Sequence, residues 1–274
     1  MGAKDTRMKN LSWHSKLVLA LIVFLPVYFV IAALGTKVGL WSWVTGLVSM
    51  TFTAGPILLG IVAAIALISL IIGLVKKPRS KVTIGIALVG VVLPALMFTG
   101  FMSARSTAGE NPIHDVATDT ADPPLFSAET LAAREESGAN PLSDYQTPLG
   151  EIEMYASSPP ELAIKSHAQI INDTYARLSP LPLGGASKAD AVAAVAAAMG
   201  NMGFVDIRTD VEAGRVEGVA ETFWYGFKDD VVARVGDEEI DFRSVSRVGR
   251  SDLGANAKRI EELRNRVADQ IGQR

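Results

Sequence analysis

The chain has 274 residues and a formal net charge of −3, and its charges are unevenly divided. Residues 1–102 carry nine lysines and arginines and one acid, whereas residues 103–274 carry 17 basic and 28 acidic side chains. The acidic second part argues against nucleic acid as a partner, because phosphate binding needs a basic face. Cysteine is absent, which excludes disulfides and thiolate catalysis, and three histidines leave little room for a zinc site. We therefore expect no metal and no cofactor.

Three long apolar runs in the first part are the strongest structural signal. They are Leu17–Leu34, Ala54–Val75 and Val82–Met102, and none of them contains a charged residue or a histidine. A helix of about 20 apolar residues crosses a hydrocarbon core of roughly 30 Å. The runs predict a three-helix transmembrane anchor over residues 17–102. Its lack of ionisable groups argues against proton or ion transport.

Basic residues beside these runs predict the orientation. Residues 1–16 hold four lysines and arginines and the loop at residues 76–81 holds four more, whereas the first loop holds only Lys37. Lysine and arginine concentrate on the cytoplasmic side of membrane proteins. We therefore expect a multi-pass protein of the cell inner membrane. Residues 1–16 would form a cytoplasmic tail, and the chain after Met102 would lie in the periplasm.

This orientation predicts the behaviour of reporter fusions. Alkaline phosphatase fused after Arg274 should be active, and the same enzyme fused at Arg79 should be inactive, because its disulfides form only in an oxidising compartment. Phosphatase activity on colonies measures this directly, with green fluorescent protein at the same two positions as the reciprocal control. The opposite pattern of activities would overturn the orientation.

The second part divides into a connector and a domain. Residues 103–150 are rich in Ser, Thr, Pro, Gly and Asp and predict an extended connector with one short helix near Ser127–Glu136. Residues 151–274 predict an α+β domain with the order α-β-β-β-β-α, in which short turns demand antiparallel strands. We expect a four-stranded meander with helices on one face and solvent on the other. The expected elements are helices at 161–178, 187–199 and 253–271, and strands at 204–208, 215–224, 230–235 and 239–247.

Three stretches of the second part contain most of its candidate functional residues: NPIHDVATDTADPPLF (111–126), WYGFKDDVVARV (224–235) and DFRSVSRVGRSDLGANAKR (241–259). Together they resemble the bacterial and plastid family known as domain of unknown function 1499. Its motifs are I-H-D-[IV]-x-T-D, F-K-D-D and R-S-x-S-R-x-G-x-S-D-x-G-x-N-A-x-R, and the similarity spans roughly residues 105–270. That family has no established activity, so the resemblance implies a fold and a class of location rather than a reaction.

The first stretch contains the candidate catalytic residues His114, Asp115 and Asp119. A His–Asp pair near a serine is compatible with hydrolysis, but the chain has no G-x-S-x-G elbow. A calcium loop needs oxygens at alternate positions and a distal Glu, which the spacing of Asp115, Asp119 and Asp122 does not provide. We favour an extended segment with buried apolar residues, docked on the arginine-bearing strand at 239–247.

The second stretch contains adjacent carboxylates, Asp229 and Asp230. Neighbouring strand residues point to opposite faces of a sheet, so the two carboxylates are poorly arranged to share one catalytic site. If the next hairpin pairs Val232 with Arg243, then Asp230 lies diagonal to Arg243 and Arg247. We therefore predict that Asp229, Asp230, Arg243 and Arg247 form structural ion pairs.

The third stretch contains the candidate ligand-binding residues Arg247, Arg250, Ser251 and Asn256. They surround a predicted helix N-terminus, where unpaired N–H groups and nearby arginines can bind an anion. Against this, Asp252 can satisfy those donors, and the arginines can pair with aspartates of the other stretches. Both interpretations stay open at this point.

We interpret the sequence as a membrane protein whose periplasmic domain is a non-catalytic binding or accessory module, with an anionic lipid or another envelope molecule as ligand. One alternative is an envelope hydrolase that uses His114 and the nearby aspartates. The other is a structural subunit of a larger membrane complex. The expected partners are the lipid bilayer and either an anionic lipid or a membrane protein, with no nucleic acid.

Overall fold

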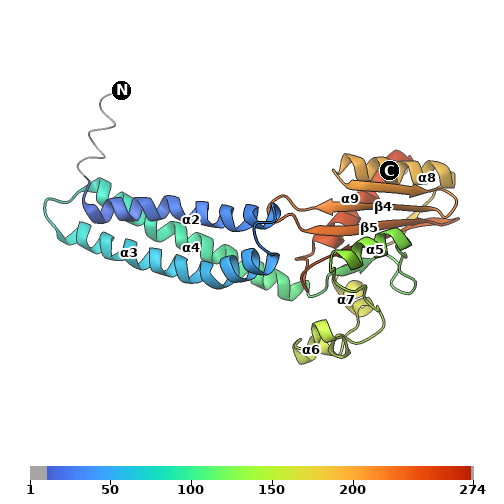
Figure 1. Ribbon diagram of the computed structural model, residues 1–274, viewed down its shortest axis with the longest axis horizontal. Coiled ribbons are helices and arrows are strands. Elements are labelled where there is room, and N and C mark those ends of the chain that lie inside the picture. Colours follow the sequence, from blue (N-terminus) through green and yellow to red (C-terminus); the bar gives the residue numbers. More distant parts are fainter. Residues whose placement is uncertain (1–10, 273–274) are drawn as a thin grey trace, which may run out of the picture. The chain divides into compact units, whose positions relative to one another are not determined.

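The computed structural model describes residues 11–272 and divides the chain into two compact units (Figure 1). The first unit comprises residues 1–106 together with Phe223–Gly226, and the second comprises 107–222 and 227–274. Most of the predicted connector, 103–150, thus belongs to the second unit, so the compact domain begins well before the expected boundary at 151. The predicted cytoplasmic tail, residues 1–16, lies mostly outside the described residues.

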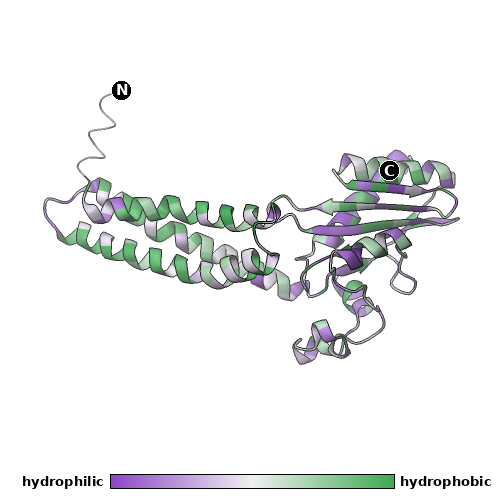
Figure 2. Ribbon diagram, viewed as in Figure 1, coloured by the Kyte–Doolittle hydropathy of each residue, from purple (hydrophilic) through white to green (hydrophobic). Residues whose placement is uncertain are grey.

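The first unit contains three long apolar helical segments. They are α2 (Trp13–Lys37), a π-helix η1 (Val44–Ala54) that continues into α3 (Gly55–Val75), and α4 (Lys81–Glu110). Each is long and apolar enough to cross a membrane, and apolar residues predominate along them (Figure 2). The three predicted spans are therefore present as helices. Which membrane they enter, and in which orientation, stays a prediction.

The second of these helices begins about ten residues earlier than the sequence predicts. Its π-helical start contains two threonines whose hydroxyls donate to backbone carbonyls five residues back, Thr51 to Gly46 at 2.8 Å and Thr53 to Val48 at 2.9 Å. These bonds satisfy the hydroxyls inside the helix. These threonines lower the hydropathy of the sequence, but they fit within an apolar helix. The whole helical segment, Val44–Val75, is 32 residues long.

The second unit is built on an antiparallel sheet. The four predicted strands are β3 (Val205–Asp210), β4 (Arg215–Glu221), β5 (Lys228–Val235) and β6 (Glu239–Ser246), and each pairs with the next along the chain. Two strands that were not predicted, β1 (Asp115–Ala117) and β2 (Leu181–Pro182), both pair with β6. The sheet therefore has six strands in place of the expected four. The extra strands have only three and two residues, too few to show an alternating pattern.

The pairing of β5 with β6 determines which side chains share a face. Val232 lies opposite Arg243 and Asp230 lies opposite Val245. Val231 and Ala233 consequently join the main hydrophobic core on one side, whereas Val232 packs with Phe126 on the other. Below, these sides are called the helix face and the strap face, where the strap is the segment 118–147.

Helices α8 (Lys188–Asn201) and α9 (Ala255–Gln270) cover the helix face (Figure 1). The helix predicted at 253–271 is present as α9, and most of its apolar side chains are buried, with Ile260 and Leu263 inaccessible to solvent. The helix predicted at 161–178 is instead two short ones, α6 (Pro160–Ala163) and α7 (His167–Thr174). The break falls at Ser166, because its hydroxyl accepts from the Gln169 N–H and the Gln169 amide accepts from the Ser166 N–H.

The strap covers the opposite face of the sheet, which corrects the prediction of a solvated side. Helix α5 (Ala128–Glu136) within the strap lies over β4 and β5, and Phe126 packs on Val232 and Val245. Glu217 of β4 lies on the face expected to be solvated but is only 3% exposed, because Ser127 and Thr130 of the strap donate to its carboxylate. At Glu217, the polar alternation of β4 therefore reflects a buried contact with the strap and not solvent.

The turn before β4 contains a glycine that no other residue can replace without strain. Gly214 has φ of 62°, and a Cβ there would lie 2.2 Å from the carbonyl oxygen of Val235. Gly138 has a similar φ of 61°, but a Cβ there meets nothing within 4 Å. The two positions separate the cost of the backbone conformation from the cost of a steric clash.

We expect Gly138→Ala to lower the free energy of unfolding by about 1–2 kcal/mol, the cost of a left-handed backbone at a non-glycine residue. Gly214→Ala should lower it considerably further, since the backbone must move to relieve the clash with Val235. Thermal melting of the purified full-length variants in detergent measures both. Equal melting temperatures for the two variants would contradict the tight turn.

Candidate functional site

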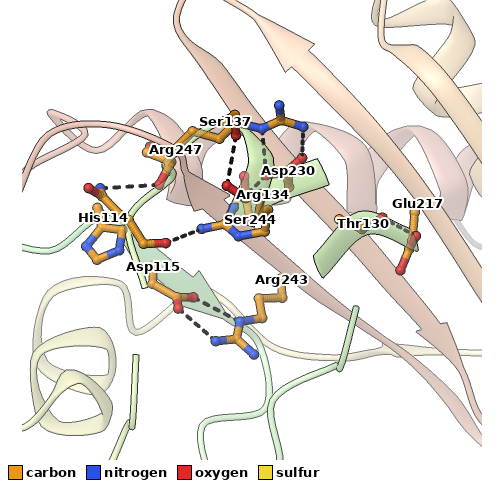
Figure 3. Close-up of polar contacts among 12 residues, drawn as sticks. His114, Asp115, Thr130, Arg134, Ser137, Glu217, Asp230, Arg243, Ser244 and Arg247 are labelled. Carbon is orange, nitrogen blue, oxygen red and sulfur yellow. Dashed lines mark hydrogen bonds and ion pairs between the residues drawn. The ribbon is translucent and has the colours of Figure 1, made fainter. Parts of the chain in front are cut away.

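A buried ion pair joins the first and third sequence motifs. Asp115 of β1 and Arg243 of β6 form two hydrogen bonds, from Nε to Oδ1 at 3.0 Å and from Nη2 to Oδ2 at 2.7 Å. The Tyr145 hydroxyl donates to Oδ1 at 2.6 Å and the backbone N–H of Ser143 to Oδ2 at 3.0 Å. Figure 3 shows the carboxylate facing the guanidinium across the strand pair. The prediction that the first motif docks on the arginine-bearing strand is confirmed by this pairing.

The electrostatics of this pair favour the charged forms. Burial acts to raise the pKa of Asp115, but the Arg243 guanidinium and the hydroxyl of Tyr145 outweigh it, so the pKa lies below its usual value. Burial likewise acts to lower the pKa of Arg243, and Asp115 outweighs it in the opposite direction. Burial and the negative charge of Asp115 both raise the pKa of Tyr145, which therefore remains a donor. An ionised carboxylate with four donors is not available as a nucleophile or a base.

A second ion-pair cluster lies on the strap face around Asp230. Arg247 donates to both carboxylate oxygens, at 2.9 and 2.7 Å, and Arg134 of α5 donates to one of them (Figure 3). The Phe126 ring lies between two arginines, with the guanidinium carbons of Arg134 and Arg243 each 5.9 Å from its centroid. Asp230 thus has Arg247 as a partner, as the register predicts, while Arg243 pairs with Asp115.

Asp229 lies on the helix face, because it is adjacent to Asp230 in the strand. Its partner is Arg259 of α9, whose Nη2 donates to Oδ2 at 2.6 Å. The same guanidinium donates to the Ser244 hydroxyl at 3.0 Å and to the Asn256 side chain. The last arginine of the third motif therefore ties α9 to β5 and β6.

Asn256 is fully buried, so the predicted ligand-binding role is not compatible with its position. Its amide nitrogen donates to the carbonyl of His114 at 2.8 Å and to the Ser246 hydroxyl at 3.0 Å, and its oxygen accepts from Ser244 at 2.6 Å. The side chain thus uses its donors and its acceptor to join α9, β6 and the residue before β1.

Asp252 occupies the helix N-terminus that was considered as an anion site. Its carboxylate accepts from the backbone N–H groups of Gly254 and Asn256, both at 2.8 Å. Burial raises the pKa of Asp252 to about 6, against these two bonds, which lower it. Of the other candidates, Ser251 donates to the Asn111 carbonyl at 2.6 Å and Arg250 to the Ser157 hydroxyl at 2.7 Å. The N–H groups of Gly254, Ala255 and Asn256 at this helix start are therefore already bound within the protein.

His114 and Asp119 are also engaged by their surroundings. The His114 Nε2 lies 3.2 Å from the carbonyl oxygen of Pro141, and Nδ1 lies 2.7 Å from the Tyr155 hydroxyl. The Tyr155 hydroxyl also donates to the carbonyl oxygen of Arg250 at 3.2 Å, so both ring nitrogens of His114 and the hydroxyl belong to one internal network. Burial lowers the pKa of His114, which keeps the ring neutral. Asp119 forms an ion pair with Arg234 at 3.2 Å. The candidate catalytic residues of the hydrolase alternative are therefore engaged in contacts within the protein.

Sequence reasoning did not identify a serine and a histidine that the fold brings together. The Ser143 hydroxyl lies 2.9 Å from His167 Nε2, beside a cavity of about 220 Å³ that Ser143, Tyr155 and Met154 help to line. Burial lowers the pKa of His167 to about 4, and its buried Nδ1 has no hydrogen-bond partner among the described residues. A serine triad needs an acid at that nitrogen, so this pair lacks the third member. Its two members are 24 positions apart and carry no motif.

A groove lies between the end of α7 and the start of α9. Its volume is about 460 Å³. Its lining combines apolar side chains with two exposed basic residues and one exposed acid. These lining residues include Tyr175, Leu178, Leu253, Ala257, Arg177, Lys258 and Glu261, together with Asn111, which directly follows α4.

The three motifs all lie within residues 111–259 of the chain. Residues 115–267 match the model of the family described as "Protein of unknown function (DUF1499)". The chain belongs to this family. A search of curated proteins and a search of solved structures each found no match to this chain. Family membership thus agrees with the resemblance of the motifs, and the family's description names no activity.

The Asp115–Arg243 pair makes a direct prediction about stability. Asp115→Asn leaves Arg243 buried without a countercharge, which should lower the free energy of unfolding by about 3–5 kcal/mol. For a domain of this size the melting temperature should fall on the order of 10 °C. Thermal melting of the full-length protein in detergent measures the change.

The control for this variant is an exposed ion pair. Asp173 lies 2.8 Å from Lys165, and both side chains are largely in solvent. Asp173→Asn should leave the melting temperature nearly unchanged, because exposed pairs contribute little. If both variants melt like the wild type, the buried pair does not stabilise the domain.

Proposed function

We propose that the protein is an inner-membrane protein whose periplasmic domain is a non-catalytic binding module for an anionic phospholipid. The observation that carries this proposal is the groove between α7 and α9. It combines an apolar surface with two basic side chains and starts at the residue after a candidate membrane-spanning helix. An amphiphile with a charged head and apolar chains matches such a lining.

The internal pairing of the motif residues supports a binding role over a catalytic one. Asp115, Asp229 and Asp230 each have an arginine partner, and the Asp252 carboxylate caps α9. Catalytic groups need access to a substrate and a free atom to react. Buried and paired, Asp115, Asp229 and Asp230 have neither, so their role is to hold the domain together around a binding surface.

The two basic side chains of the groove are free to bind a ligand. Within residues 11–272, neither Arg177 nor Lys258 has an ion pair or a side-chain hydrogen bond with another residue, and both are exposed. A phosphate diester accepts hydrogen bonds from both, and arginine can do so with two parallel N–H groups. Glu261 also lines the groove. We expect it to weaken the attraction for a negative headgroup.

Lipid retention tests this function. Full-length protein in nanodiscs of mixed phosphatidylglycerol and phosphatidylcholine should retain phosphatidylglycerol when released into the gas phase for native mass spectrometry. Arg177→Ala with Lys258→Ala should lose this retention, whereas Glu261→Gln should increase it, because one negative charge leaves the groove.

The control is Arg266→Ala, which removes an exposed arginine of α9 that pairs with Glu262 outside the groove. It should retain the lipid as the wild type does. Equal retention by the groove variant and the control, or equal binding of both lipids, would count against the proposed ligand. The alternative of a structural subunit predicts a stoichiometric membrane-protein partner in the same preparation.

A further inference from the structure

The turn between β4 and β5 exposes two large aromatic side chains. Phe223 is 72% exposed and Trp224 is 52% exposed, and their rings contact each other edge to face with centroids 5.1 Å apart. Within the described residues of the second unit, the sheet and its helices bury most aromatic side chains, including Phe242 and Tyr155. Two adjacent exposed aromatics at one turn are an apolar patch that water solvates poorly.

The turn holds its shape without these two rings. Its ends are closed by a hydrogen bond from the Thr222 N–H to the Phe227 carbonyl and one from the Phe227 N–H to the Thr222 hydroxyl, both at 2.8 Å. Gly226 has φ of 66°, which completes the reversal of the chain. Since the backbone bonds define the turn, Phe223 and Trp224 are not needed to fill a core. Their exposure points to a partner outside the domain.

We propose that Phe223 and Trp224 insert into the interfacial layer of the bilayer that the chain itself enters. Two observations identify the bilayer as the partner. The structure groups Phe223–Gly226 with the unit that contains the three candidate membrane-spanning helices. The second unit also begins at Thr107, within the last turn of the candidate membrane-spanning helix α4. Tryptophan and other aromatics are enriched at the depth of the lipid headgroups.

The insertion is separate from the lipid groove and does not depend on it. The groove is lined by residues of α7 and α9, and the turn belongs to the β4–β5 hairpin. Burying an aromatic ring at the interface contributes through its apolar area, whatever the headgroup. A vesicle of phosphatidylcholine alone should therefore suffice for insertion.

The sheet provides a matched control at its other end. Val211, in the turn before β4, is 50% exposed. Because β4 has seven residues, the two turns that flank it are roughly 20 Å apart at about 3.3 Å per residue. A probe at Val211 therefore reports on a turn of similar exposure that points away from the aromatic one.

The absence of cysteine allows a single label at each turn. Phe223→Cys and Val211→Cys, each in the full-length protein and labelled with an environment-sensitive fluorophore, are reconstituted into phosphatidylcholine vesicles. The label at 223 should emit at shorter wavelength and be quenched several-fold more by lipids spin-labelled near the headgroup than the label at 211. Aqueous iodide should quench the label at 211 and spare the label at 223.

Two outcomes overturn the proposal. Equal iodide quenching at both positions means that the aromatic turn lies in water. A label at 223 that is shielded from iodide but insensitive to the spin-labelled lipids is covered by protein, either a second copy of the chain or another partner. If Phe223→Cys does not fold, Trp224→Cys supplies the same measurement from the neighbouring side chain.

Discussion

The buried Asp115–Arg243 pair is the interaction on which the second unit depends. Two charges removed from water are tolerated only when their hydrogen-bonding capacity is met by the protein. Here that requirement is met by Tyr145, by the backbone of Ser143 and by the carbonyl of Pro124, all of which belong to the strap. The pair therefore holds the strap on the sheet, and the strap in turn shields the pair from water.

The same requirement explains why the motif residues are so closely interconnected. Each aspartate on a central strand must find a guanidinium, and the alternation of the strand sends Asp229 toward α9 and Asp230 toward α5. One dipeptide thus links the helices on both faces to the sheet. The uncharged side chain of Asn256 also joins separate elements, because it forms hydrogen bonds with β6 and with His114, the residue before β1. The motifs define how the layers of the domain are joined.

Much of this could be predicted from the sequence, because local patterns determine it. The four longer strands, the last helix and the pairing of Val232 with Arg243 follow from alternation, spacing and a short turn. The docking of the first motif on β6 was predicted, but the cover that the rest of the strap forms over β4 and β5 was not, since its composition is that of a linker and its contacts are distant in sequence. Glu217 illustrates the difficulty, because a carboxylate bonded to Ser127 and Thr130 gives the same pattern as one in water.

The candidate site was predicted less well for a related reason. The pair Asp230–Arg247 follows from strand register, but Arg243 finds its partner 128 positions earlier in the chain. At the last helix, the sequence offered either an anion site or donors satisfied by Asp252, and the structure has Asp252 accepting from the helix start. The Ser143–His167 pair and the groove at Arg177 and Lys258 bring together residues that share no motif. Such sites depend on how α7 and the strap pack, which periodicity does not describe.

The position of β6 between β5 and the two short strands has a consequence for how the chain matures. Its outer edge pairs with β1 and β2, which are made long before it during synthesis. Until β6 (Glu239–Ser246) is synthesised, β1 and β2 have no partner strand, so the sheet cannot close before then. Contacts of such long sequence separation slow folding, because a large loop must be ordered first. Once formed, they cover a strand edge that would otherwise recruit a neighbouring chain, so the late-closing edge also protects the finished domain from aggregation.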